Sequence, residues 1–139
     1  MMNICYLKKI SVLLILFLSN SVVWSQDSPN IILLIGDGMG LTQISAGMYS
    51  NGNSTALEGF EYIGLSKTSS SNSLVTDSAA SGTAMATGVK TLNGVLGISS
   101  KNIKQKSILE ICQEFNYTTA LIATSSIVHA TPASFYAKE

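Results

Sequence analysis

The stretch NIILLIGDGMG, residues 30–40, decides the fold class. Its five consecutive apolar residues, 31–35, are typical of a strand covered on both faces, as in parallel sheets. The glycine-rich turn that follows places Asp37 at the carboxyl end of this strand. The turn is no dinucleotide fingerprint, because Leu41 stands where the third glycine is required, and it lacks the Gly-Lys-Ser/Thr ending of a P-loop. Asp37 is therefore either a turn-capping acid or a ligand for a metal ion.

Further elements of the same kind follow along the chain. YIGLSKT (62–68) and TTALIAT (118–124) predict two more short strands. Residues 41–49 predict a short helix, and residues 106–115 an amphipathic one, because apolar side chains recur there at spacings of three and four. Strands alternating with helices indicate an α/β layered architecture. In open parallel sheets, ligands bind at the carboxyl ends of strands, where the polar loops of this chain would converge.

Charge and the amino-terminal segment restrict the class of protein. Eight lysines and no arginine balance eight acids, which argues against a nucleic-acid partner. Residues 1–25 combine a short basic start, an apolar run and a small-residue cleavage site, the pattern of a secretory signal peptide. A stable membrane anchor is the weaker interpretation, because the apolar run is short and interrupted by polar residues. We expect export to the periplasm or the exterior, and one domain over residues 26–139.

VTDSAASGTA, residues 75–84, consists almost entirely of small residues. It does not match the nucleophile elbow G-x-S-x-G. Its alanines allow a helix that begins near Asp77 or Ser78. Ser78 is then either the N-cap of this helix or a nucleophile, since a helix N-terminus offers free N–H groups and positive potential to an alkoxide or a phosphate.

HATP, residues 129–132, contains the only histidine of the chain. A lone histidine such as His129 is more often structural than a ligand. Thr131 is either a hard oxygen ligand for magnesium or a hydroxyl before a proline turn. Pro132 biases Thr131 towards an extended conformation.

Taken together, the segments resemble alkaline phosphatases. NIILLIGDGMG, LSKT, VTDSAASGTAMATGVKT with NGVLG, and HATPAS occur in the order of that family, over essentially all of residues 30–139. The resemblance implies an αβα sandwich, present here as its amino-terminal portion, and hydrolysis of phosphate monoesters through a phosphoserine on Ser78. It implies two zinc ions and one magnesium ion per site, with Asp37 shared between a zinc and the magnesium, and Thr131 on the magnesium.

The resemblance also implies supporting roles. Asp77 is similar to an acid that orients a substrate-binding arginine, and the Ala79 N–H to a donor for a phosphate oxygen. His129 matches the family branch that carries histidine rather than aspartate beside magnesium, so we expect weaker magnesium binding. The arginine and several metal ligands of the family are absent. We therefore expect an incomplete catalytic domain that is inactive and poorly folded alone.

Two alternatives remain open on the sequence. One is a non-catalytic exported phosphate-binding module or remnant, for which the missing ligands are the argument. The other is a phosphodiesterase or sulfatase of the same superfamily, which VTDSAAS disfavours because those enzymes typically use another nucleophile motif. The resemblance further implies phosphate monoesters as substrates and a possible homodimer of the full-length protein.

Overall fold

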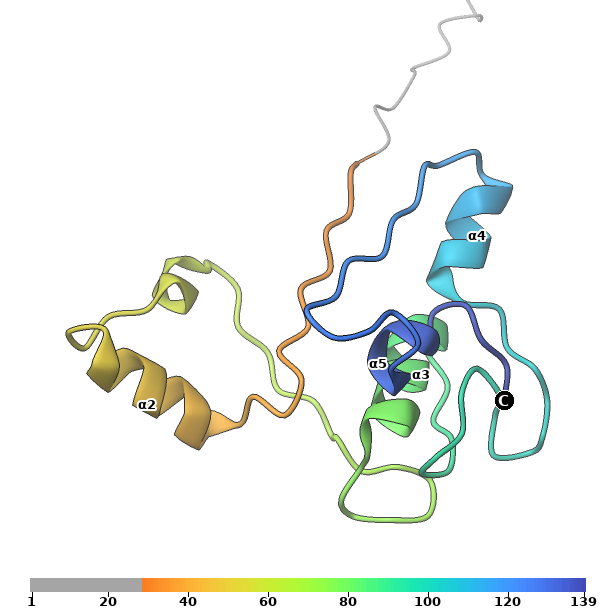
Figure 1. Ribbon diagram of the computed structural model, residues 1–139, viewed down its shortest axis with the longest axis horizontal. Coiled ribbons are helices and arrows are strands. Elements are labelled where there is room, and N and C mark those ends of the chain that lie inside the picture. Colours follow the sequence, from red (N-terminus) through yellow and green to blue (C-terminus); the bar gives the residue numbers. More distant parts are fainter. Residues whose placement is uncertain (1–28) are drawn as a thin grey trace, which may run out of the picture. The chain divides into compact units, whose positions relative to one another are not determined.

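The computed structural model describes residues 29–139, and its helical elements lie between residues 41 and 133 (Figure 1). They are α2 (Leu41–Ser50), the 3-10 helix η1 (Ala56–Gly59), α3 (Ser78–Thr87), α4 (Ile108–Glu114) and α5 (Ala130–Ala133). The chain divides after Leu34 into two units, and every contact discussed below lies within the second, residues 35–139. The predicted signal peptide, residues 1–25, lies outside the described residues. Within residues 29–139, no helix combines the length and apolarity that crossing a membrane requires.

Helix α3 forms where small residues are framed by two caps. The Asp77 carboxylate accepts the Ala80 N–H at 2.8 Å and so satisfies one of the free donors of the first turn. Gly88 ends the helix in the left-handed conformation, at φ +73°, which glycine adopts without a steric penalty. The buried residues of α3 are Ala79, Ala80, Gly82, Thr83 and Ala86.

The smallness of α3 lets other segments approach its backbone closely. Helix α3 contacts both α5 and α4. A Cβ atom on Gly82 would lie only 2.4 Å from the Ser134 Oγ, so only glycine leaves room for this approach. Ala133, Ser134 and Phe135 are buried on the other side of the contact. The core around α3 is therefore built from small side chains rather than from large aliphatic ones.

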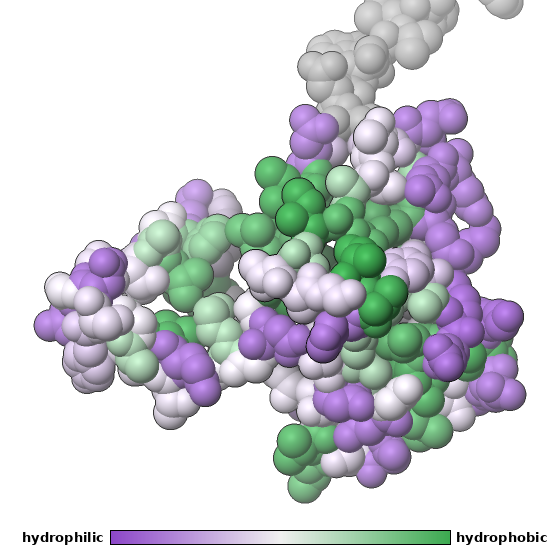
Figure 2. Space-filling view, viewed as in Figure 1, coloured by the Kyte–Doolittle hydropathy of each residue, from purple (hydrophilic) through white to green (hydrophobic). Residues whose placement is uncertain are grey.

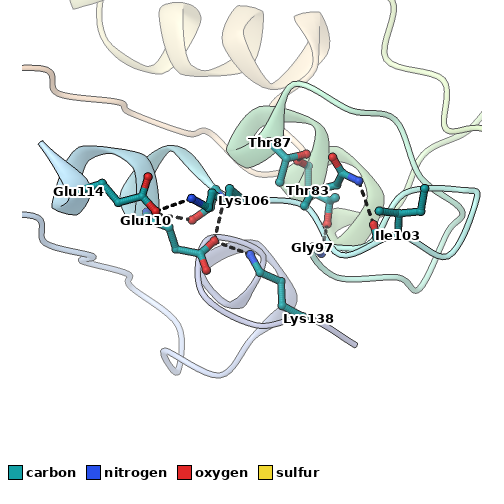
Figure 3. A network of polar contacts seen from close by, with 10 residues as sticks. Thr83, Thr87, Gly97, Ile103, Lys106, Glu110, Glu114 and Lys138 are labelled. Atoms are coloured by element: carbon teal, nitrogen blue, oxygen red, sulfur yellow. Dashed lines mark hydrogen bonds and ion pairs between the residues drawn. The ribbon is translucent and has the colours of Figure 1, made fainter.

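Polar contacts fix the loop and the helix that follow α3 (Figure 3). The buried Thr83 hydroxyl donates to the Val95 carbonyl at 3.2 Å and accepts the Gly97 N–H at 2.9 Å. These two bonds tie the loop after α3 to the middle of the helix. The residues that the family resemblance quoted as NGVLG are thereby held against α3.

Helix α4 begins with a capping box. Ser107 accepts the Glu110 N–H, and the Glu110 carboxylate accepts the Ser107 N–H at 2.7 Å. Glu110 also accepts a hydrogen bond from the Lys138 ammonium at 2.6 Å (Figure 3). The bonds from Lys138 and Ser107 lower the pKa of the Glu110 carboxyl below its ordinary value. The helix predicted over residues 106–115 is confirmed, with slightly shorter bounds set by this cap.

The three predicted strands do not form ladders in the part of the chain that the structure describes. Residues 31–35, 62–68 and 118–124 have no strand assignment, and the one bridge among residues 29–139 joins Ile98 to Lys104. A strand exists through hydrogen bonds to neighbouring strands, and no described segment supplies them here. The prediction of strands at these positions is therefore wrong for this structure. The helix predicted over residues 41–49 is confirmed as α2.

Candidate active site

Three oxygen-bearing side chains from distant parts of the sequence meet around one carboxylate. The Ser78 hydroxyl lies 3.1 Å from each carboxylate oxygen of Asp37. The Thr131 hydroxyl donates to Oδ2 of the same carboxylate at 2.5 Å. The residues are 41 and 94 positions from Asp37 in sequence, so only the fold brings them together. Asp37, Ser78 and Thr131 are here called the oxygen cluster.

A tight glycine turn presents the Asp37 carboxylate. Gly36 and Gly38 flank the residue, and Gly38 has φ +64°, a conformation that favours glycine. The Met39 N–H closes the turn on the Gly36 carbonyl at 3.2 Å. The Asp37 side chain caps no helix, because α2 begins after Gly40 without a side-chain cap. Asp37 instead points its carboxylate at the two hydroxyl groups.

Asp77, not Ser78, is the N-cap of α3. Because Asp77 takes the capping position, the Ser78 hydroxyl is free to face Asp37. Among the described residues, the Ser78 and Ala79 N–H groups have no acceptor in the protein. They lie at the positive end of the α3 dipole, as donors for an anion would. The structure thus places Ser78 at a helix N-terminus without making it the cap.

The Asp77 carboxylate is fully engaged by backbone donors. One oxygen accepts the Ala80 N–H at 2.8 Å, and the other accepts the Gly94 N–H at 2.6 Å. Sequence reasoning had assigned Asp77 to orienting an arginine, a residue type that this chain lacks. Within residues 29–139, the carboxylate instead fixes the start of α3 and the turn at Gly94.

The structure brings Thr131 to the cluster but leaves His129 apart from it. Thr131 lies in α5, whose N-cap is His129. The His129 side chain is exposed and makes no capping hydrogen bond. Among the described residues, no hydrogen bond joins the imidazole to the oxygen cluster. Pro132 lies inside α5, where it needs no N–H partner in the first turn. Thr131 is therefore helical, and the extended conformation expected for it before a proline is wrong.

The donor set of the oxygen cluster suits a hard cation in part. One carboxylate and two hydroxyl groups are the oxygen ligands that magnesium accepts. Zinc instead takes three or four ligands, commonly histidine, cysteine or carboxylate. In the part of the chain that the structure describes, no three His, Cys, Asp or Glu side chains gather as a metal site. The cluster therefore fits part of a magnesium or mixed-metal site and not a complete zinc site.

Sequence reasoning missed Asn93 and Gly94 as parts of this region. The Asn93 side chain accepts the Asp77 N–H and donates to the Val75 carbonyl. The signal in the sequence was the Asn-Gly pair, which is typical of a turn. That signal predicts the turn but not the segment on which the turn packs.

Comparisons with known proteins agree with this arrangement. The family model described as alkaline phosphatase matches residues 28–139. Alkaline phosphatase 4 of Bacillus subtilis is 44% identical over 115 residues, covering 76% of this chain and 25% of that protein. The alkaline phosphatase of Escherichia coli K12 is 39% identical over 123 residues, covering 80% of this chain and 26% of that protein. The chain thus spans about a quarter of the length of these curated relatives.

Solved structures show the same relationship. The alkaline phosphatase of the Antarctic bacterium TAB5 superposes with a TM-score of 0.76 and 49% identity, over 79% of this chain and 32% of that one. A histidine-to-aspartate variant of the TAB5 enzyme, described with magnesium bound in its M3 site, gives the same TM-score, identity and coverage. The predicted fold class is confirmed by these neighbours, of which the matched part is about a third. The chain therefore belongs to the alkaline phosphatase family.

Proposed function

We propose that this chain carries the nucleophile segment of a metal-dependent phosphate monoester hydrolase. The observation that supports this most is the Ser78 hydroxyl, held by both oxygens of Asp37 at the N-terminus of α3. A serine hydroxyl is a weak nucleophile unless a base, a metal or a lowered pKa activates it. A half-buried serine beside a carboxylate and free N–H groups is arranged for such activation.

The proposed reaction has two steps at Ser78. In the first, Ser78 Oγ forms a bond to phosphorus while the bond from phosphorus to the ester oxygen breaks, and the departing alcohol takes up, through solvent, the proton that Ser78 loses. In the second, water attacks phosphorus, the bond to Ser78 Oγ breaks, a proton from the attacking water returns to Ser78 Oγ, and inorganic phosphate is released. The free Ala79 N–H would donate to a phosphoryl oxygen, where negative charge gathers.

Asp37, Ser78 and Thr131 are the residues of this chain that would hold metal ions. Bound zinc and magnesium would stabilise the attacking and leaving oxygens electrostatically. Asp37 orients the Ser78 hydroxyl and the Thr131 hydroxyl towards one point. The ratio of two zinc ions to one magnesium ion is carried over from the family resemblance, and the further ligands would come from residues outside this chain.

The remaining expectations also belong to this proposal. The substrates would be phosphate monoesters, and the full-length protein would form a homodimer. Export to the periplasm or the exterior rests on the predicted signal peptide at residues 1–25. Inactivity of the 139-residue chain on its own rests on the incomplete set of zinc ligands among the described residues.

A chimera tests the proposed function directly. Residues 28–139 would replace the matching segment of Bacillus subtilis alkaline phosphatase 4, which supplies the remaining three quarters. We expect hydrolysis of p-nitrophenyl phosphate with zinc and magnesium, and a loss of about 10³-fold or more in the Ser78→Ala chimera. Incubation with inorganic phosphate at acidic pH should add one phosphoryl group to the peptide that contains Ser78.

The control variant is Ser81→Ala, three residues along the same helix. The Ser81 hydroxyl donates to the Asp77 carbonyl at 2.7 Å and does not reach Asp37. The Ser81→Ala chimera should keep most of its activity and still accept a phosphoryl group. A folded, metal-loaded chimera that fails to hydrolyse the ester, or a Ser78→Ala chimera that remains active, would refute the proposal.

A further inference from the structure

The side chain of Asn93 makes hydrogen bonds to the backbone of residues 75–77 that a neighbouring strand would make in a sheet. Its Nδ2 donates to the Val75 carbonyl at 3.0 Å, and its Oδ1 accepts the Asp77 N–H at 3.3 Å. In extended backbone, the carbonyl of one residue and the N–H of the residue two positions later point to the same side. Asp77 has this extended conformation, with φ −102° and ψ 177°. One carboxamide therefore satisfies both groups.

Gly94 also makes a hydrogen bond to Asp77. Its N–H donates to the second carboxylate oxygen of Asp77 at 2.6 Å, while the first oxygen caps α3 through Ala80. Gly94 has φ +82°, so the turn that delivers this N–H favours glycine. Asn93 and Gly94 together contact the Asp77 N–H, the Asp77 carboxylate and the Val75 carbonyl. They are called the Asn-Gly clamp below.

The clamp is itself anchored from the other side. The Asn93 N–H donates to the Asn72 side-chain oxygen at 3.1 Å, and the same oxygen accepts the Ser70 hydroxyl at 3.0 Å. Farther along, the Gly97 N–H donates to the buried Thr83 hydroxyl. The clamp therefore lies between two hydrogen-bonded anchors, the turn at residues 70–73 and the middle of α3.

We propose that Asn93 is a positioning residue for Ser78, acting through the backbone at residues 75–77. A serine side chain is one bond long, so the position of its Oγ follows the backbone that carries it. The clamp fixes that backbone immediately before Ser78, and Asp37 then meets the hydroxyl at 3.1 Å. This inference rests on the proposed function for its catalytic consequence, and on the contacts alone for its structural one.

Amide hydrogen exchange in the chimera tests the structural consequence. Asn93→Ala removes both side-chain hydrogen bonds of Asn93, so exchange of the Asp77 and Ala80 N–H groups should become about 3- to 10-fold faster. Asn51→Ala is the matched control, because the Asn51 side chain also donates to a backbone carbonyl, that of Ser54, at 3.0 Å. It should leave exchange at Asp77 and Ala80 unchanged. Equal exchange in the Asn93→Ala chimera and the unsubstituted chimera would overturn the proposal.

Kinetics of the chimera test the catalytic consequence. A displaced nucleophile slows the chemical step more than it weakens ground-state binding, so Asn93→Ala should lower kcat about 10- to 100-fold and change KM less than about threefold. Asn93→Asp keeps an acceptor for the Asp77 N–H but turns an oxygen towards the Val75 carbonyl, and it should not restore kcat. An unchanged kcat, or a change confined to KM, would contradict the positioning role.

The two readouts separate this inference from the proposed function. An inactive unsubstituted chimera would refute the proposed function and leave the exchange measurement to decide the role of Asn93. An active chimera with normal kcat in Asn93→Ala would refute only the positioning role. The Asn51→Ala chimera should match the unsubstituted chimera in both kcat and KM.

Discussion

At the scale of single residues, the site depends on short side chains held around one carboxylate. Asp37 accepts hydrogen bonds from both Ser78 and Thr131. Serine and threonine have little reach, so neither can adjust to a shifted backbone by changing rotamer alone. The position of each hydroxyl therefore depends directly on the position of the helix that carries it.

His129 carries the prediction that belongs to this scale. It is the exposed N-cap of α5, two residues before Thr131, and a neutral or cationic imidazole attracts a dication less than a carboxylate does. His129→Asp in the chimera should therefore bind magnesium about tenfold more tightly in a calorimetric titration.

His129→Asn separates charge from capping in that experiment. Asparagine and aspartate are comparably good N-cap residues, so both stabilise the start of α5 to a similar extent. Only aspartate adds negative charge near the oxygen cluster. Magnesium affinity should therefore rise in His129→Asp and remain near the unsubstituted value in His129→Asn. Equal affinities for all three proteins would show that residue 129 does not act on the magnesium site.

At the scale of secondary-structure elements, the contact between α3 and α5 sets the distance between Ser78 and Thr131. Gly82 and Ser134 form the closest part of this contact. The Ser134 hydroxyl donates to the Thr131 carbonyl at 2.7 Å, and Ser134 is fully buried. A displacement of Ser134 would therefore also displace Thr131.

Gly82→Ala is expected to destabilise the chain although alanine favours helices. The new Cβ would lie 2.4 Å from the Ser134 Oγ and 3.1 Å from the Ser134 Cβ, so the Ser134 side chain would have to move. Overpacking of this kind costs about 1–3 kcal/mol, against a helix-propensity gain of up to about 1 kcal/mol. The free energy of unfolding of the chimera, measured by denaturant titration, should fall.

Gly47→Ala provides the opposite result at an open position. No heavy atom lies within 4 Å of a Cβ on Gly47 in α2, so the substitution should stabilise that helix by about 0.5–1 kcal/mol. If Gly82→Ala were as stabilising as Gly47→Ala, the close α3–α5 contact would not exist in solution. Gly82→Ala should also weaken magnesium binding in the chimera, because it displaces Thr131, whereas Gly47→Ala should not.

The helices could be predicted from the sequence because the residues that favour them are close together in the chain. The apolar spacing over residues 106–115 and the small residues after Asp77 both predicted helices that the structure contains. The identity of the cap was not accessible, because Asp77 and Ser78 are both favoured N-cap residues. The hydrogen bonds that join Asn93 to Asp77 and Val75 could not be predicted either. They join positions 16 and 18 residues apart, and local propensity carries no information on such pairs.

At the scale of the whole molecule, the predicted strands show what local patterns leave out. Residues 31–35 are apolar throughout, yet Ile32 and Leu34 are more than four-fifths exposed. Ile63, Leu65 and Ile122, from the other two predicted strands, are at least 88% exposed. The apolar pattern predicts that other segments bury these residues, but it does not identify those segments. Figure 2 shows apolar residues exposed on the visible face.

The region of α2 and η1 adds to this uncovered apolar surface. Ile44, Met48, Leu57 and Phe60 are among the residues that line an open hollow of about 450 Å³. Large exposed apolar patches are unusual in a soluble monomer and promote association. The fold class is confirmed by the solved relatives, which superpose with this chain over about a third of their length. The uncovered residues are therefore those of a family member described without most of its sandwich.

This exposure gives the prediction for the isolated chain. The 139-residue chain should bind the dye ANS, lose helical signal without a cooperative transition on heating, and associate as its concentration rises.

The double variant Ile63→Lys, Leu65→Lys should bind less dye and associate less, because it places charge on one of the exposed segments. Its control, Ser100→Lys, Thr118→Lys, adds the same two lysines at exposed polar positions and should change neither property. The chimera should bind little dye, since the remainder of the sandwich would cover the same residues. A cooperative, monomeric chain that binds no dye would show that residues 29–139 close a core of their own, and the exposed strand segments would then need another explanation.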